Sequence, residues 1–146
     1  QGDEPLLDAT VIDACVEALQ THPDDVMSTA RRPLADHEAE TPAVVKVVTD
    51  ADGVALYFSR APIPYARAGE PAPVRWAHLG LYAYRRDFLL RLADLAPTAL
   101  ELAESLEQLR VLEHGFRIRC VAARTASIGV DTPDDLERVR QLMVTR

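Results

Sequence analysis

The chain has 146 residues, a formal net charge of −7 at pH 7, and 48% hydrophobic residues. This length is sufficient for one domain with a buried core. The acidic charge argues against a general nucleic-acid binder, which needs a basic face. No apolar run approaches the roughly 20 residues that span a bilayer, so the composition is that of an ordinary globular protein.

The first half of the sequence predicts a helix, a strand and a hairpin. Asp8 can cap a helix that continues to about Thr21. Its predicted apolar face consists of Val11, Ile12, Cys15, Val16 and Leu19. A short strand is predicted at 26–30, followed by a polar loop at 31–42.

Residues 44–49 and 54–58 are rich in β-branched and aromatic side chains, with a turn ending in Gly53 between them. This pattern predicts a β-hairpin. The prolines that follow predict a long loop. The hairpin either covers its own core or stands off the sheet and pairs with another subunit, and the sequence leaves both open.

In the second half, strands and helices alternate. The predicted elements are a strand at 76–84, a helix at 88–95, one helix from a capping box at Thr98 to about Gly115, a strand at 117–122 and a terminal helix from Pro133. Such alternation indicates an α/β fold, and the hairpin makes its sheet mixed. We interpret residues 1–146 as a single domain with a hairpin and loop insertion at about 43–75.

The two cysteines, Cys15 and Cys120, lie in a helical and a strand-like pattern. We interpret them as buried, unpaired side chains in a reducing compartment. No secretory signal pattern opens the chain. A cytoplasmic location is therefore expected.

Two acidic turns are the strongest candidates for chemistry. Asp131 lies at the mouth of a strand-to-helix turn, where ligands of open α/β sheets bind. Asp3 lies in a second acidic turn that also precedes a helix. Two such carboxylates can hold one magnesium ion, which prefers oxygen ligands. The alternative is that Asp131 is a solvated turn residue.

Five further side chains are candidates for binding. Arg60 follows a strand and suits a carboxylate, while His78 and Tyr82 share one face of a strand. Glu107 and Gln108 lie beside the apolar stripe of a helix. Structural roles remain open for these residues: Arg60 as a helix C-cap, His78 as a core histidine, and Glu107 as a solvated position. The sequence contains no nucleophile elbow, P-loop, dinucleotide fingerprint or zinc-protease motif.

Six blocks in order carry a family resemblance that spacing alone does not supply. They are QGDEP (1–5), VKVV (45–48), ALYFSRAPIP (55–64), HLGLYAYR (78–85), LEQLR (106–110) and GVDTP (129–133). Together they resemble the C-terminal part of the 3-deoxy-manno-octulosonate cytidylyltransferases, or CMP-Kdo synthetases, from Gln1 to about Arg140.

The resemblance implies a nucleotide-diphospho-sugar-transferase-like fold, a hairpin that takes part in dimerisation, and a homodimer. It also implies a reaction in which CTP and the sugar acid Kdo give CMP-Kdo and pyrophosphate, a step of lipopolysaccharide synthesis, with Mg²⁺ as cofactor. Asp3 and Asp131 would be the catalytic metal ligands. The residues implied for the Kdo pocket are Gln1, Arg60, His78, Tyr82, Glu107 and Gln108.

The sequence departs from the family pattern at its start. The N-terminal strand and the Gly/Arg/Lys loop that binds the CTP phosphates do not appear in it, nor do the residues that read cytosine. We therefore expect this chain to be inactive alone. One alternative is a nucleotidyltransferase for another sugar acid. The other is a non-catalytic remnant that dimerises or binds.

Overall fold

The computed structural model describes residues 8–69, 73–123 and 133–144. The helices and strands in chain order are α1 (Ala9–Thr21), β1 (Met27–Pro33), the 3₁₀ helix η1 (Asp36–Glu38), β2 (Lys46–Thr49), β3 (Ala55–Ser59), β4 (Trp76–Tyr84), α2 (Arg86–Leu92), α3 (Ala99–Glu104), α4 (Gln108–Glu113), β5 (Ile118–Ala122) and α5 (Pro133–Val144).

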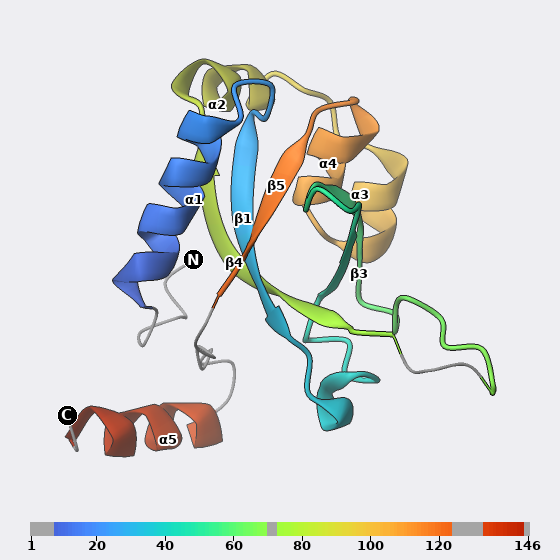
Figure 1. The fold of residues 1–146 in the computed structure, drawn as a ribbon, viewed down its shortest axis with the longest axis vertical. Helices are drawn as coiled ribbons and strands as arrows, with labels where there is room; N and C mark the ends of the chain where they lie inside the picture. The colour runs from blue at the N-terminus through green and yellow to red at the C-terminus, as the bar shows by residue number, and fades with distance from the viewer. Residues whose placement is uncertain (1–7, 70–72, 124–132, 145–146) are drawn as a thin grey trace.

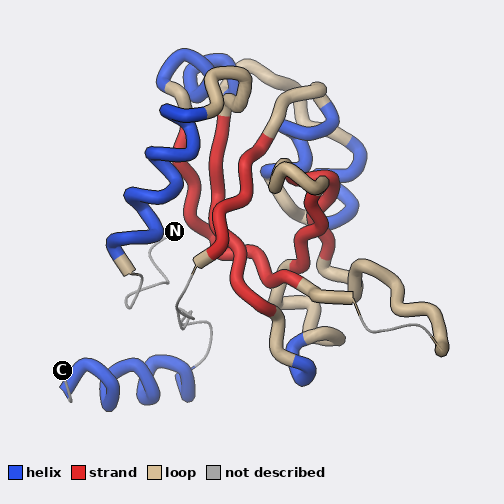
Figure 2. The backbone as a smooth tube through the Cα atoms, viewed as in Figure 1, coloured by secondary structure: helices blue, strands red, loops and turns tan. Residues whose placement is uncertain are grey.

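In the described part of the chain, five strands form one sheet in the order β3-β2-β4-β1-β5 (Figures 1 and 2). Strands β1 and β5 are parallel, and the other neighbours are antiparallel. Helix α1 packs against β1, β4 and β5, while α4 packs against β3 at the other side of the sheet (Figure 1). The predicted mixed sheet with flanking helices is confirmed.

The sheet separates two hydrophobic cores. The smaller core lies under α1 and includes Cys15, Ala30 and Leu79. The larger core lies on the other face, where Phe58 and Leu109 are fully buried. Because successive strand residues point to opposite faces, the even-numbered positions of β4 face the larger core.

The β2–β3 hairpin belongs to this sheet, and its turn contacts β5. The carboxylate of Asp50 accepts hydrogen bonds from the main-chain N–H groups of Asp52 and Val54, at 3.0 and 2.8 Å. Gly53 adopts a φ of +82°, which favours glycine, and its carbonyl accepts a 2.9 Å bond from the N–H of Cys120 in β5. The hairpin therefore covers its own core, and its pairing with a second subunit stays a prediction.

The prediction of one helix from Thr98 to about Gly115 was wrong. Helix α3 ends at Glu104, Ser105 adopts a left-handed φ of 52°, and α4 starts anew at Gln108. The break buries Leu106 in the larger core and leaves Leu102, which lies on the same apolar stripe of the predicted helix, exposed. It also moves Glu107 from mid-helix to the N-cap of α4.

Two smaller predictions also need correction. Strand β1 continues to Pro33, because its whole length pairs with β4, so the loop predicted from residue 31 starts later. On α1 the buried face is centred on Cys15 and Leu19, and Ile12 and Val16 are 44% and 43% exposed. The predicted cap was correct: the N–H of Thr10 donates to Asp8 at 2.9 Å.

No helix among the described residues has the length and apolar composition that crossing a membrane requires. Helix α5 begins at Pro133 as predicted, whereas Asp131 and the turn around it lie outside the described residues.

Candidate functional site

Aromatic rings follow one another along the face of β4 that points toward the larger core. The ring centres of His78 and Tyr82 are 5.4 Å apart, and those of Tyr82 and Tyr84 are 6.1 Å apart. Phe58 of β3 meets His78 edge to face at 5.1 Å. The predicted placement of His78 and Tyr82 on one strand face is confirmed.

His78 combines a polar ring with a half-buried position in the sheet. Its Nε2 lies 2.8 Å from the hydroxyl oxygen of Thr29 in β1. Burial lowers the pKa of His78 to about 3, so the imidazole is uncharged at neutral pH. A neutral imidazole has one donor and one acceptor nitrogen, and His78 can therefore orient a ligand without adding charge.

A pocket of about 250 Å³ opens between the end of β4 and helices α2 and α4. Its lining residues are Tyr82, Tyr84, Leu89, Leu92, Ala93, Glu107, Gln108, Arg110 and Val111. The split between α3 and α4 places Glu107 at the helix start and Gln108 in the next, buried position. The structure thus brings together three side chains that the family resemblance implied, Tyr82, Glu107 and Gln108.

The pocket offers hydrogen-bonding groups with little free positive charge. Burial, with the nearby Tyr84 and Glu107, raises the pKa of Tyr82, so its phenol stays protonated. Arg110 is held by the carboxylate of Glu101 through two bonds of 2.8 and 2.5 Å. Such a two-point ion pair neutralises the guanidinium. The lining therefore suits a hydroxyl-rich ligand.

Arg60 lies beside this pocket and not in its lining. Its guanidinium donates to the main-chain carbonyls of Glu104, Pro42 and Ser105, at 2.8, 3.1 and 3.3 Å. Ser105 is the left-handed residue two positions before Glu107. The structure therefore joins Arg60 to the turn that starts α4. Glu104 is the last residue of α3 and Ser105 is its C-cap. By these contacts Arg60 caps the C-terminus of a helix, which is the alternative that the sequence left open.

A half-buried carboxylate and a buried ammonium hold the main chain of Arg60. The carboxylate of Glu104 accepts its N–H at 2.9 Å and the hydroxyl of Ser59 at 2.6 Å. The ammonium of Lys46, the only lysine in the sequence, donates to its carbonyl at 2.6 Å. Burial opposes ionisation of Glu104, yet the bonds from Ser59 and Arg60 keep its pKa below the usual value.

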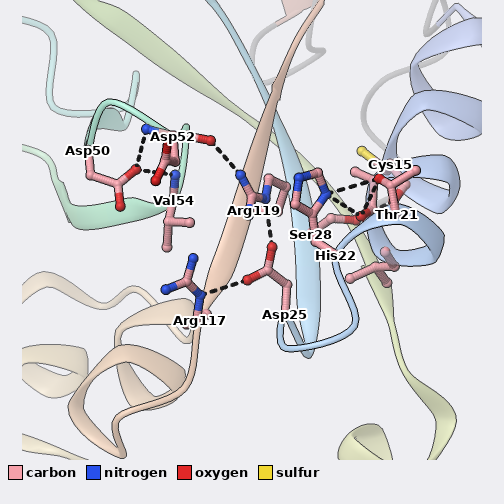
Figure 3. A network of polar contacts seen from close by, with 12 residues as sticks. Cys15, Thr21, His22, Asp25, Ser28, Asp50, Asp52, Val54, Arg117 and Arg119 are labelled. Atoms are coloured by element: carbon pink, nitrogen blue, oxygen red, sulfur yellow. Dashed lines mark hydrogen bonds and ion pairs between the residues drawn. The ribbon is translucent and has the colours of Figure 1, made fainter.

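A larger hollow of about 520 Å³ lies at the end of the sheet where β1 and β5 begin. Its most buried cation, Arg85, donates to the carbonyls of Leu19, His22 and Asp25, at 2.5, 3.2 and 2.9 Å. Beside it, Asp25 bonds both Arg117 and Arg119 (Figure 3). These groups satisfy one another, so volume alone does not make this hollow the functional site.

Gln1, Asp3 and Asp131 lie outside the described residues. Within the described ranges, no group of three or more His, Cys, Asp or Glu side chains could hold a metal ion. The hypothesis of a magnesium site at Asp3 and Asp131 therefore stays a prediction.

The structure adds residues that the sequence did not indicate. Tyr84 follows Tyr82 by two positions in the same strand, and this spacing was a signal for a second pocket aromatic. Thr29 and Glu104 act through partners 49 and 44 residues away. No local pattern marks such contacts.

Comparison with known proteins gives one consistent result. The cytidylyltransferase family model matches residues 1–118. The chain is 52% identical over 143 residues to a 3-deoxy-manno-octulosonate cytidylyltransferase of Anaeromyxobacter dehalogenans strain 2CP-C, covering 98% of this chain and 58% of the relative. It is 49% identical over 150 residues to the protein of that name in Geobacter sulfurreducens, with 95% and 60% covered.

A solved structure agrees in fold. CMP:2-keto-3-deoxy-manno-octonic acid synthetase, complexed with CTP, matches with a TM-score of 0.92 and 42% identity over 99% of this chain and 60% of that one. The chain thus spans about three fifths of the length of the proteins it matches. On the family match over residues 1–118, and on the agreement of fold, this chain belongs to the cytidylyltransferase family.

Proposed function

We propose that the protein containing this chain transfers a cytidylyl group from CTP to the sugar acid Kdo, for lipopolysaccharide synthesis. The anomeric hydroxyl oxygen of the sugar bonds to the α-phosphorus, the bond to the β-phosphate oxygen breaks, and pyrophosphate leaves. The hydroxyl proton passes to solvent. The observation that carries the proposal is the pocket of Tyr82, Glu107 and Gln108, in a chain that is 52% identical to a 3-deoxy-manno-octulosonate cytidylyltransferase.

The pocket residues would bind the sugar hydroxyls. The phenol of Tyr82 stays protonated and can donate, and the amide of Gln108 offers both a donor and an acceptor. Leu89, Leu92 and Val111 give the pocket apolar walls, and a bound sugar that displaces water from them would strengthen each hydrogen bond. Binding through several oriented hydroxyl contacts would hold the anomeric oxygen in line with the phosphorus.

Arg60 would bind the sugar carboxylate. A guanidinium has five N–H donors, and the three contacts to main-chain carbonyls leave two of them. These contacts fix the guanidinium plane before the ligand arrives, which reduces the entropy lost on binding. A fixed guanidinium with spare donors suits a planar carboxylate.

Asp3 and Asp131 would hold a magnesium ion, since both supply the hard carboxylate oxygens that this ion prefers. The ion would neutralise charge on the phosphoryl oxygens during the transfer. Gln1 would join the sugar pocket. All three assignments rest on the family resemblance.

We further propose that the protein acts as a homodimer in the cytoplasm. The edge strand β3, whose Leu56 is 61% exposed, supports the dimer. Cys15 and Cys120 are unpaired and buried, which suits a reducing compartment.

The test is pyrophosphate release by the protein expressed from its complete reading frame, with CTP and either Kdo or sialic acid. Kdo should be the preferred sugar, and Gln108→Leu should raise the KM for Kdo roughly tenfold, since it removes the amide contacts. Gln20→Leu is the matched control on the exposed face of α1. Preference for sialic acid, or no turnover with either sugar, would overturn the proposal.

A further inference from the structure

A fully buried hydroxyl, that of Thr29, lies at an irregular point of the sheet. Thr29 pairs with Tyr82, but the next residue, Ala30, pairs with Leu79, so Gly80 and Leu81 bulge out of the β4 ladder. A bulge leaves main-chain groups outside the regular pairing. The Thr29 oxygen lies 2.7 Å from the Leu81 carbonyl and 3.2 Å from the Leu79 carbonyl.

The same oxygen lies 2.8 Å from Nε2 of His78, and this set of three neighbours fixes where the protons are. A hydroxyl has one proton to donate, and a carbonyl oxygen can only accept. The proton of Thr29 therefore points to a carbonyl, with Leu81 the nearer. The remaining contact must run the other way: Nε2–H of His78 donates to the Thr29 oxygen.

A neutral imidazole that carries its proton on Nε2 has a bare acceptor at Nδ1. The ring is neutral because burial lowers its pKa to about 3. No described residue supplies a hydrogen-bond partner for Nδ1, whereas Phe58 and Tyr82 pack against the ring. The ring is thus held in place with one acceptor open, next to a residue that lines the pocket.

We infer that Thr29 is a positioning residue that keeps His78 in its Nε2–H form, so that Nδ1 accepts a hydrogen bond from a hydroxyl of the bound sugar acid. The ligand in this inference rests on the proposed function. The tautomer does not. A site that requires a hydroxyl proton at this point discriminates against an analogue in which that hydroxyl is missing or methylated, because Nδ1 is then left without a partner.

The test joins a spectroscopic measurement to a kinetic one on the protein from its complete reading frame. ¹⁵N-histidine NMR should show the His78 signals, identified by their loss in His78→Asn, as a protonated Nε2 and an unprotonated Nδ1. Thr29→Val should remove the acceptor, expose the Nε2 proton to exchange and mix the tautomers. It should raise the KM for the sugar acid roughly tenfold without changing that for CTP. Thr29→Ser should restore both.

Ser28→Ala is the matched control. Ser28 is the neighbouring buried residue of β1, and its hydroxyl donates to the Cys15 carbonyl at 2.7 Å on the opposite face of the sheet (Figure 3). Its loss should lower stability as Thr29→Val does, yet leave the His78 signals and the sugar KM unchanged.

A protonated Nδ1 in the wild-type protein overturns the inference. So does a sugar KM in Thr29→Val that stays within twofold of the wild type, or a Ser28→Ala variant that reproduces its effects. An Nε2–H tautomer without any binding of the sugar acid to the wild-type protein overturns the proposed function and the ligand in this inference, and leaves only the tautomer.

Discussion

Two regions of the sheet use their polar side chains in opposite ways. Where β1 and β5 begin, the carboxylate of Asp25 is 1% exposed and accepts bonds from Arg117 and Arg119, at 2.8 and 2.6 Å (Figure 3). Arg119 also donates to the carbonyl of Asp52 in the hairpin turn. Beside the pocket that Tyr82 lines, by contrast, Nδ1 of His78 has no partner among the described residues.

The difference separates stability from binding. Removing one partner of a buried ion pair is strongly destabilising, because the other charge is left uncompensated. A polar group without a protein partner adds no such bond to the folded state, but it can gain a partner when a ligand arrives. We therefore expect changes around Asp25 to affect folding and changes around the pocket to affect affinity.

The largest expected effect is that of Asp25→Ala. The substitution leaves the buried guanidinium of Arg119 without its carboxylate, and should lower the free energy of unfolding by about 3–5 kcal/mol. Urea unfolding measures this. The neighbouring Asp24 is exposed, so Asp24→Ala should change stability by less than about 0.5 kcal/mol. Equal effects of the two substitutions would show that the Asp25 cluster does not stabilise the fold.

A second, smaller effect is expected at Lys46. Its ammonium is fully buried and donates to the carbonyls of Thr41, Val44 and Arg60, at 3.0, 2.8 and 2.6 Å. Lys46→Met should cost about 2–3 kcal/mol of unfolding free energy, because these carbonyls lose a charged donor. It should also raise the sugar KM, because Arg60 loses one of its supports.

The Lys46→Met variant tests whether effects on stability and effects on affinity are separate. Lys46 is a stabilising cation that also borders the site, so the prediction requires both effects in one protein. A Lys46→Met variant with wild-type stability would mean that water replaces the ammonium at the three carbonyls. A destabilised variant with an unchanged sugar KM would remove Lys46 from the positioning of Arg60.

Local patterns predicted the sheet well and the pocket only in part. The strand at 76–84 and the cap at Asp8 follow from side-chain alternation and N-cap chemistry, which act over a few residues. The break at Ser105 has no such signal, since Leu102, Leu106 and Leu109 continue a helical stripe across it. The break follows from tertiary packing, because it buries Leu106 and Leu109 in the core and leaves Leu102 exposed.

The same limit applies to the site. Residue types suggested Arg60 as a carboxylate partner, and the structure shows that three main-chain carbonyls already hold it. The tautomer of His78 depends on Thr29, which meets it only because of the bulge at Gly80 and Leu81. Sequence patterns can nominate a side chain, but its available donors and acceptors depend on tertiary contacts.

The third prediction concerns Arg60→Lys. Lysine keeps the charge but lacks the planar fork, so the KM for the sugar acid should rise roughly tenfold, with little change in that for CTP. Arg86→Lys is the matched control, since the Arg86 side chain is 83% exposed. A sugar KM that is unchanged in Arg60→Lys would mean that Arg60 acts only as a cap on α3.

The last effect is absent at neutral pH and appears only on acidification, in a different pH window for each region. Burial opposes the charge on Asp25, but Arg117 and Arg119 hold its pKa below the usual value. Its stabilisation is complete above the unfolded pKa of about 3.9 and is lost as the pH falls through the folded value. His78 has a folded pKa of about 3 and an unfolded value near 6.5. Its contribution therefore declines from about pH 6.5 downward, since only the unfolded chain takes up the proton.

Unfolding free energies measured by urea between pH 8 and pH 3 separate the two windows. His78→Asn should flatten the pH dependence between about pH 6.5 and 4.5, whereas Asp25→Asn should flatten it only below about pH 4. The same curve shape in both variants would mean that one coupled network joins His78 to the ion pairs of Asp25. Separate windows would mean that the pocket can be changed for a new ligand without weakening the ion pairs of Asp25.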